Sequence, residues 1–235
     1  MKKILTKFNS FLKKISKKSL FLLRLYQYLR AVRLLFNKSF RALFFSTKKG
    51  DVCIDIGANI GDASLIFWLK GAKIIYAIEP HPIAFEELQN NLKGIKNIKL
   101  FNLAISDTNG LDKLYLHQEV HKDNNDKTLL KFSQSSSLVS AKNNLGKSFF
   151  EIKTSTIQDF LGICRYKPTI IKCDIEGAEY EIYRDLVNIA KNRELRILLI
   201  ECHSHNYPKF KESHKNFIDE INKNNLNRKF DLSWH

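Results

Sequence analysis

Two carboxylates and one histidine stand out because each follows a short apolar run. Asp174 ends the run at residues 169–174, Glu176 comes two positions later, and His203 follows the run at residues 196–202. A carboxylate that leaves a buried strand is costly unless it finds partners, so Asp174 is predicted to serve a site. His203 ionises near neutrality and could act as a general base, with a structural hydrogen bond as the alternative role. These residues indicate acid–base chemistry at two strand ends.

Two further carboxylates lie beside these residues in the sequence. Glu201 adds a negative charge just before His203. Glu179 is predicted to stabilise the start of the following helix, where the helix dipole favours an acidic side chain. Only Glu201 is therefore expected to join the site.

The segment DIGANIGD at residues 55–62 is the strongest binding signal in the chain. It stands between an apolar run and a helical pattern, so its main chain can approach a ligand and its amides can face a negative group. A dinucleotide fingerprint needs glycine where Asn59 and Asp62 stand, and the segment lacks the G-K-[ST] ending of a P-loop. NAD and nucleoside triphosphates are therefore disfavoured.

Glu79 follows the next apolar run, 22 residues after Gly57. A carboxylate at this strand end can accept hydrogen bonds from both hydroxyls of a ribose, whereas the alternative is a surface carboxylate before a turn. The predicted ligand is an adenosine without a pyrophosphate, a description that S-adenosylmethionine fits. The segment at residues 102–107 could hold the adenine, or could be an ordinary turn.

The elements that position these residues alternate between strand and helix patterns. Together they predict an α/β protein with a doubly wound, mostly parallel sheet. Residues 111–117 and 147–153 resemble strands that flank a polar loop at residues 120–146. The predicted buried strands cover residues 51–56, 73–78, 97–104, 169–175 and 196–202, and the predicted helices cover residues 60–70, 82–93, 178–190 and 208–223.

The positive charge is concentrated at the start of the chain. The chain has 39 Lys and Arg and 24 Asp and Glu, and residues 1–49 hold 14 of the basic residues and none of the acidic ones. Residues 50–235 therefore carry 25 basic and 24 acidic residues, a net charge of +1. Apolar residues recur at helical spacing through residues 2–45, which predicts one or two basic amphipathic helices before a catalytic domain at 50–235. Arginines interrupt every apolar run, so neither a secretory signal nor a membrane span is predicted.

The partners of this basic segment remain open at this point. Residues 1–45 could dock on an anionic membrane surface, or their apolar face could cover the enzyme's own pocket. Nucleic-acid binding is disfavoured because the remaining domain is close to neutral. The spacing of the four cysteines matches no metal or redox motif, which favours reduced thiols in a cytoplasmic protein. If residues 1–45 dock on a membrane, the protein is expected at the inner face of that membrane.

Seven motifs in order resemble the FkbM family of S-adenosylmethionine-dependent methyltransferases. They are D-I-G-A-N-I-G, I-E-P-H-P, A-I-S-D, S-S-S-L, K-T-S-T-I-Q-D-F, I-K-C-D-I-E-G-A-E-Y and L-I-E-C-H, and they run from about Asp51 to His203. The resemblance implies a Rossmann-like class I methyltransferase fold. It also implies O-methylation of a hydroxyl, commonly on a sugar, so a sugar or glycoconjugate is the expected acceptor.

The resemblance also assigns roles to single positions. It implies that Glu79 binds the ribose of the cofactor and that Ser136 and Ser137 lie on the loop over the pocket. The methionine end would be bound by Asp55, Gly57, Asn59 and Gly61, and the adenine by Ala104, Ile105 and Ser106. The acceptor would be faced by Asp174, Glu176 and His203. The working hypothesis is that Asp174 positions the acceptor and His203 deprotonates it. No metal is expected, and magnesium on Asp174 and Glu176 is the alternative. The residues after 223 are too few for the last two strands usual in such folds, so the final antiparallel strand is in doubt.

Two rival functions remain. An RNA methyltransferase would use the basic segment to follow phosphates, with Asp174 and Glu201 in a ribose-methylating site. A membrane-associated protein would keep the fold without catalysis. The acceptor's identity and the oligomeric state are not decided by the sequence.

Overall fold

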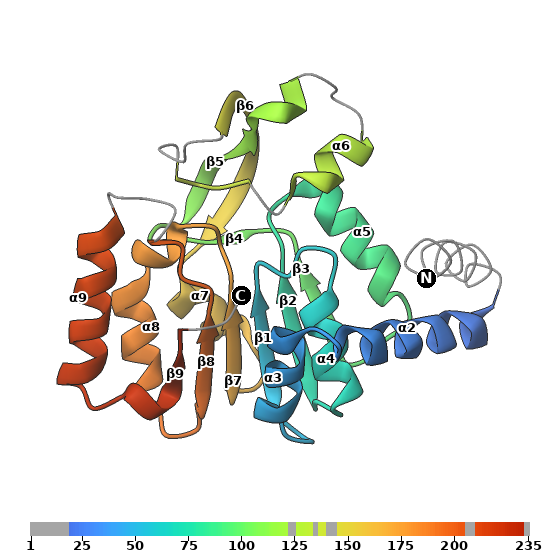
Figure 1. Cartoon of the computed structure of the whole chain (residues 1–235), viewed down its shortest axis with the longest axis horizontal. Coiled ribbons are helices and arrows are strands. Elements are labelled where there is room, and N and C mark those ends of the chain that lie inside the picture. Colours follow the sequence, from blue (N-terminus) through green and yellow to red (C-terminus); the bar gives the residue numbers. More distant parts are fainter. Residues whose placement is uncertain (1–18, 122–125, 134–135, 140–144, 205–209, 233–235) are drawn as a thin grey trace.

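The computed structural model describes residues 19–121, 126–133, 136–139, 145–204 and 210–232. Its centre is a six-stranded sheet in the order β3-β2-β1-β7-β8-β9 (Figure 1), and all five neighbouring pairs are parallel. The strands are β1 Val52–Ile56, β2 Ile74–Ile78, β3 Ile98–Phe101, β7 Ile170–Cys173, β8 Ile197–Ile200 and β9 Phe230–Asp231. The predicted parallel α/β sheet is confirmed. The chain order reverses between β1 and β7, the place where such sheets bind ligands.

Helices cover both faces of this sheet, which explains why the strands are nearly continuous apolar runs. On one face lie α4 Asp62–Leu69 and α5 Pro82–Leu92. On the other lie α7 Ile157–Ile163, α8 Tyr183–Ala190 and α9 Phe210–Lys223. The helix predicted at 178–190 is divided into a 3-10 turn, Ala178–Tyr180, and α8.

Helix α7 was not predicted, although a local signal for it exists. The side chain of Thr156 accepts a hydrogen bond from the backbone N–H of Asp159, and Asp159 is acidic in the first turn. A threonine followed three residues later by an acidic residue is a helix-start signature. Ile157 and Phe160 are fully buried against the sheet, so packing completes what the cap begins.

A smaller three-stranded sheet stands over the carboxyl edge of the main sheet (Figure 1). It pairs β6 Leu145–Ser155 with β5 Gly110–His117 and with β4 Ala104–Ile105. The strand predicted at 97–104 is therefore two strands in different sheets. The prediction of one polar loop at 120–146 is also wrong, because helix α6 Asp126–Lys131 forms inside it and buries Leu129 against Leu116.

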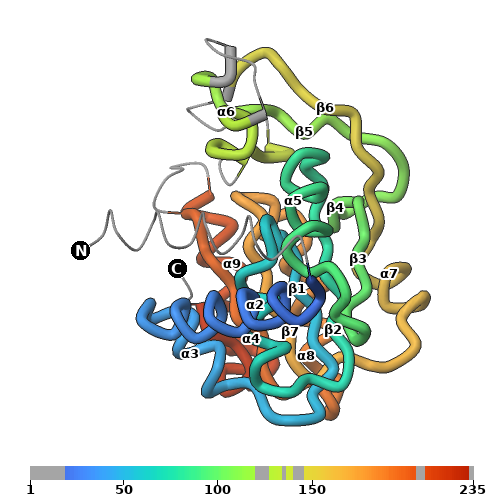
Figure 2. The backbone as a smooth tube through the Cα atoms, turned by 90° about the vertical axis from the view of Figure 1, so that its right-hand side faces the viewer, coloured from blue at the N-terminus to red at the C-terminus, as the bar shows by residue number. Residues whose placement is uncertain are grey.

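The basic segment forms two helices over the described part of the predicted stretch, α2 Leu20–Leu34 and α3 Lys38–Ser46. They lie across α4, as both Figure 1 and Figure 2 show. Ala31 and Leu43 are fully buried in the core cluster that α4 and α5 share. Residues 2–18 of the predicted helical stretch lie outside the described residues.

The far edge of the main sheet is formed by β9, which pairs parallel to β8. The residues after 223 thus add one strand to the sheet, where the sequence analysis expected too few residues for two, and this strand is parallel. Residues 233–235 lie outside the description. Among the described helices, none has both the length and the apolar character needed to span a bilayer.

Candidate active site

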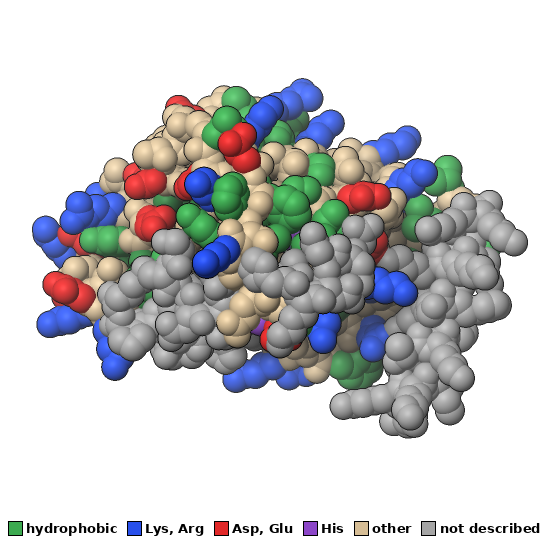
Figure 3. Space-filling view, turned by 90° about the horizontal axis from the view of Figure 1, so that it is seen from above, with side chains coloured by type: hydrophobic (Ala, Val, Ile, Leu, Met, Phe, Trp, Pro, Cys, Tyr) green, Lys and Arg blue, Asp and Glu red, His purple; other side chains and the backbone are tan. Residues whose placement is uncertain are grey.

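A cavity of about 280 Å³ opens at the carboxyl edge of the main sheet, where the strand order reverses. Figure 3 looks onto this edge, and a histidine with acidic atoms beside it is visible near the centre of the face. Its walls come from the ends of β1, β2, β7 and β8, from β4 and β5, from Ser133 and residues 136–138, and from the connection between α2 and α3. Of the sequence-predicted residues, those lining it are Gly57, Asn59, Glu79, Ala104, Ile105, Ser136, Ser137, Asp174, Glu176 and Glu201. His203 is outside this lining, behind the carboxylates of Asp174, Glu176 and Glu201.

The two glycines of the turn after β1 are required by close packing. Gly57 has φ +72°, and a Cβ there would lie 1.8 Å from the backbone oxygen of Asp174. Gly61 has φ +92°, and a Cβ there would lie 2.8 Å from Leu88 Cδ1. Gly57 lines the cavity, whereas Gly61 is outside its lining and lets α5 approach α4. Close packing against the backbone of Asp174 explains Gly57, and packing against leucine side chains of α5 together with the left-handed backbone explains Gly61.

Glu79 is fixed against this turn and is not a surface carboxylate. It is 5% exposed, its Oε2 accepts a hydrogen bond from Asn59 N at 2.8 Å, and its Oε1 accepts one from His81 N at 2.8 Å. Burial raises the pKa of Glu79 to about 7, against the two backbone hydrogen bonds, which lower it. The carboxylate thus faces the cavity with its orientation set by main-chain donors.

Asp55 lies beneath the cavity and does not line it. It is fully buried; its Oδ2 accepts a hydrogen bond from Ser64 Oγ at 2.7 Å, and its Oδ1 lies 3.4 Å from Lys172 Nζ. Lys172 Nζ also donates to the backbone oxygen of Gly57 at 2.8 Å and lies 3.6 Å from Asp174 Oδ2. Asp55 therefore acts on the site through Lys172.

Lys172 was missed by the sequence reasoning. Burial lowers its pKa, but the carboxylates of Asp55 and Asp174 outweigh burial and raise it above its usual range, so the ammonium stays charged. A signal was present, since Lys172 interrupts an apolar run and stands directly opposite Asp55 in the β1–β7 register. Only the strand order reveals that register.

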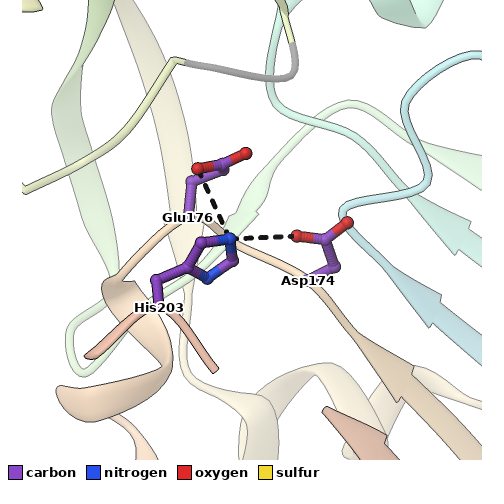
Figure 4. Close-up of side chains that lie close together, drawn as sticks. All are labelled: Asp174, Glu176 and His203. Atoms are coloured by element: carbon purple, nitrogen blue, oxygen red, sulfur yellow. Dashed lines mark ion pairs between the residues drawn. The ribbon is translucent and has the colours of Figure 1, made fainter. Parts of the chain in front are cut away.

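His203 lies among four carboxylates at the β7–β8 side of the cavity. Figure 4 shows two of them, Asp174 and Glu176, directed toward its Nε2. Its Nδ1 is 3.0 Å from Glu179 Oε1. Its Nε2 is 3.5 Å from Glu176 Oε2, 3.7 Å from Glu201 Oε1 and 4.0 Å from Asp174 Oδ1. The predicted trio of Asp174, Glu176 and His203 is therefore brought together, and Glu201 joins it.

Glu179 orients the histidine as well as serving a helix start. It is fully buried; its Oε1 accepts the backbone N–H of His203 at 3.0 Å as well as facing the ring, and its Oε2 accepts the N–H of Gly177 at 2.7 Å. The predicted role at a helix start is thus only part of its function. Because Glu179 holds Nδ1, the Nε2 atom is directed toward the other carboxylates.

These carboxylates set the protonation of the cluster. Burial lowers the pKa of His203, but the hydrogen bond to Glu179 and the charges of Glu179, Glu176 and Asp174 raise it to about 9. Burial and the charge of Asp174 raise the pKa of Glu201 to about 7. In the ligand-free protein His203 is therefore protonated at neutral pH, and Glu201 exchanges its proton there.

Ser133 and Ser137, from the segment over the cavity, form hydrogen bonds with residues after β1 and after β7. Ser137 Oγ donates to the backbone oxygen of Glu176 at 2.7 Å, and Ser133 Oγ accepts from Asn59 Nδ2 at 2.9 Å. The predicted place of Ser136 and Ser137 over the pocket agrees with their presence in its lining. Ser106 is buried, but its Oγ lies 3.2 Å from Asp107 Oδ1 and outside the cavity lining.

The acidic cluster also has the composition of a cation site. One donor atom from each of Asp174, Glu176 and His203 lies within 4.8 Å of the others. Carboxylate oxygens with one imidazole suit divalent ions such as magnesium or manganese. The magnesium alternative on Asp174 and Glu176 therefore has a third donor in His203.

The connection between α2 and α3 is a further wall, and it bears on the alternative in which residues 1–45 cover the enzyme's own pocket. The segment does reach the cavity, but through residues at this connection and not through the apolar face of α2 that the alternative named. Asn37, Ser39 and Phe40 line the cavity opposite strand-end residues more than 15 positions away in the chain. Helical spacing predicted the two helices but carried no signal for the direction in which their connecting turn points.

The family described as Methyltransferase FkbM domain matches residues 55–230, which leaves α2 and α3 outside the match. The 2-O-methyltransferase NoeI of Sinorhizobium fredii (strain NBRC 101917 / NGR234) is 26% identical over 144 residues, which is 57% of this chain and 57% of that protein. The chain thus aligns with little more than half the length of this relative.

Two solved structures illustrate the similarity at the level of the backbone. Precorrin-6y C5,15-methyltransferase from Geobacter metallireducens GS-15 has a TM-score of 0.42 at 12% identity, covering 79% of this chain and 69% of that one. Trm5b from Pyrococcus abyssi has a TM-score of 0.37 at 13% identity, covering 81% and 41%.

Proposed function

The chain belongs to the FkbM methyltransferase family and is a methyltransferase, and on this basis we propose that it uses S-adenosylmethionine to methylate a sugar hydroxyl of a glycan or glycoconjugate. The observation that carries the proposal is one cavity with buried Glu79 on its β2 side and the cluster around His203 on its β8 side. The printed name of the relative, a 2-O-methyltransferase, supports an oxygen atom as the acceptor.

The residues of the cavity fit this cofactor. Glu79 presents a carboxylate to a ribose, and Ile56, Ile78 and Ile105 offer apolar surface for a purine. Asp174 supplies negative charge on the other side, where Lys172 neutralises it only in part. When bound, S-adenosylmethionine supplies an electrophilic methyl group on a positively charged sulfur.

The protein's remaining task is to hold the acceptor hydroxyl and to remove its proton. We assign positioning to Asp174 and proton removal to His203 Nε2, which the Glu179 hydrogen bond directs toward the acceptor side. His203 must first lose the proton that it carries at neutral pH. Glu201, with a pKa near 7 and its Oε1 at 3.7 Å, is placed to receive that proton, and a positive charge bound beside Asp174 favours its release.

The cofactor is tested by titrating S-adenosylhomocysteine calorimetrically into the wild type and into Glu79→Gln. The substitution removes a buried charged acceptor, so we expect Kd to rise about 5- to 150-fold, the equivalent of about 1–3 kcal/mol. Glu86→Gln, an exposed acid on the following helix, is the matched control and should bind like the wild type. Absence of binding to folded wild-type protein would reject the proposed cofactor.

We also propose that the enzyme docks on an anionic membrane through α2, which would suit a lipid-linked glycan acceptor. Gln27 and Ala31 form the buried face of this helix, so its more apolar side is turned outward, next to exposed Arg33. Phe21 is 74% and Phe36 at the end of the helix 85% exposed. A basic helix with an outward apolar face is typical of interfacial binding. The apolar residues exposed on this side are Leu20, Phe21, Leu25, Tyr28, Leu29, Val32 and Phe36.

Flotation with phosphatidylglycerol-containing vesicles tests this surface. We expect the wild type to float and the double variant Phe21→Asp, Phe36→Asp to lose at least about tenfold in partitioning, because both apolar contacts are replaced by like charge against the lipid. Leu111→Asp, also exposed but on β5, is the control. Equal flotation of all three proteins, or none by the wild type, would contradict docking through α2. Deleting residues 1–45 is less informative, since it removes the buried Leu43.

A further inference from the structure

Residues 37–40, which are the N-cap Asn37 and the first residues of α3 and are called the α2–α3 turn below, form a wall of the cavity that comes from outside the family match at residues 55–230. Of its residues, Asn37, Ser39 and Phe40 line the cavity, whereas Lys38 is exposed and outside the lining. A segment that contributes polar groups to a ligand cavity can bind the ligand, and its position in the cavity decides which part of the ligand it contacts.

The turn is anchored to the catalytic domain on both of its sides. Gln27, fully buried, donates from Nε2 to the backbone oxygens of Asn91 at 2.9 Å and Lys93 at 3.1 Å. Arg30 forms an ion pair with Asp62, the first residue of α4. On the other side of the turn Leu43 is fully buried in the shared core. These contacts hold the turn as a fixed wall of the cavity.

The same contacts place the α2–α3 turn beside residues 57–61, the glycine turn after β1. Both α2 and α3 contact α4, which begins directly after residues 57–61, and Asp62 and Ala63 lie with the turn in the cavity lining. The ribose is assigned to Glu79 at the end of β2, and the acceptor to Asp174 and His203 beyond β7. The part of the cofactor left for the glycine-turn end is its amino-acid end.

On the basis of the proposed function, we infer that Ser39, together with Asn37 and Phe40, binds the amino-acid end of S-adenosylmethionine. The Ser39 hydroxyl can donate to the carboxylate of that end, and the Phe40 ring can exclude water beside it. The helical segment that precedes the family domain is then part of the cofactor site and sets its affinity. Removing the segment would leave the methyltransferase domain with an incomplete cofactor pocket.

The test compares two ligands that differ at this end. S-adenosylhomocysteine carries the amino-acid end, and 5′-methylthioadenosine lacks it while keeping adenine, ribose and sulfur. Ser39→Glu places a carboxylate in the first turn of α3, where an acidic residue favours the helix, so the fold should be retained. We expect this variant to bind S-adenosylhomocysteine at least about tenfold more weakly, through repulsion between like charges, and to bind 5′-methylthioadenosine within about twofold of the wild type.

Lys38→Glu is the matched control, because it puts the same side chain on the exposed neighbour and changes the net charge by more. It should bind both ligands within about twofold of the wild type. Equal weakening of both ligands by Ser39→Glu, or no weakening of either, would overturn the inference. Failure of the wild type to bind either ligand would instead reject the proposed cofactor, so the two ideas fail by different results.

Discussion

His203→Asn is expected to lower kcat of methyl transfer about 10²- to 10⁴-fold, the range that a positioned general base contributes. The asparagine amide can still donate to Glu179, which accepts from His203 Nδ1 in the wild type, but it cannot take a proton. Alanine would instead leave the fully buried Glu179 without this partner and would confuse catalysis with stability. The measurement is methyl transfer to a saturating glycan acceptor, with S-adenosylhomocysteine affinity measured in parallel.

The loss should appear in kcat and leave cofactor affinity within about twofold, because His203 is on the acceptor side of the cavity. His214→Asn is the control, since that ring is on α9 and packs against Tyr180, with its Nδ1 3.3 Å from the Tyr180 hydroxyl. Full activity of His203→Asn at a saturating acceptor concentration would reject the role of His203 as base.

The pH dependence of the reaction follows from the same cluster. A base works only after it has lost its proton, so kcat/KM should rise with pH through the range between the pKa of Glu201, about 7, and that of His203, about 9, as free-enzyme values. Glu176→Gln removes one of the charges that hold the proton on His203, which lowers the pKa of His203. The rising limb should then move to lower pH, and a limb that stays in place would contradict this electrostatic account.

Gly57→Ala is expected to destabilise the protein by about 3 kcal/mol or more and to abolish S-adenosylhomocysteine binding. The added Cβ would lie 1.8 Å from the backbone oxygen of Asp174, so β1 and β7 must move apart at their carboxyl ends. The same movement breaks the hydrogen bond from Lys172 Nζ to the oxygen of Gly57, which aligns the turn with Asp174. Urea unfolding gives the stability, and calorimetry gives the binding.

Gly50→Ala separates steric overlap from backbone strain. Gly50 also has a left-handed backbone, with φ +87°, but a Cβ there would have nothing within 4 Å. Only the strain of the left-handed conformation remains, so we expect a loss of about 1 kcal/mol and unchanged ligand binding. Equal losses for the two variants would mean that close contact with Asp174 is not the reason for glycine at position 57.

Most of the fold could be predicted because local patterns report burial directly. The strands β1, β2, β7 and β8 are apolar on both faces except for Asp55 and Lys172, and a strand covered by helices on both sides must be largely apolar. The predictions of secondary structure failed where tertiary packing, and not the local sequence pattern, decides the structure. Helix α6 lies in a polar segment and is held by Leu129, and the run at 97–104 divides because its last residues pair with β6.

The same division holds for the site. The sequence by itself determined that Glu79, Asp174, Glu176 and His203 each follow a predicted strand, and parallel strands bring such residues to one edge. It could not determine which charges face one another. The pairing of Asp55 with Lys172 depends on β7 lying beside β1, and the proton on His203 depends on Glu179, which reaches back from a different segment.

The wall at residues 37–40 is the clearest case of what only the tertiary structure decided. Helical periodicity predicted one or two helices in residues 2–45, but it describes each helix by itself and does not say what the helix packs against. The face that packs on the domain is marked by Gln27 and Ala31, whereas the more apolar side turns outward. The buried amide hydrogen bonds of Gln27 and the Arg30–Asp62 ion pair join positions more than 30 residues apart, and such contacts exist only once the chain is folded.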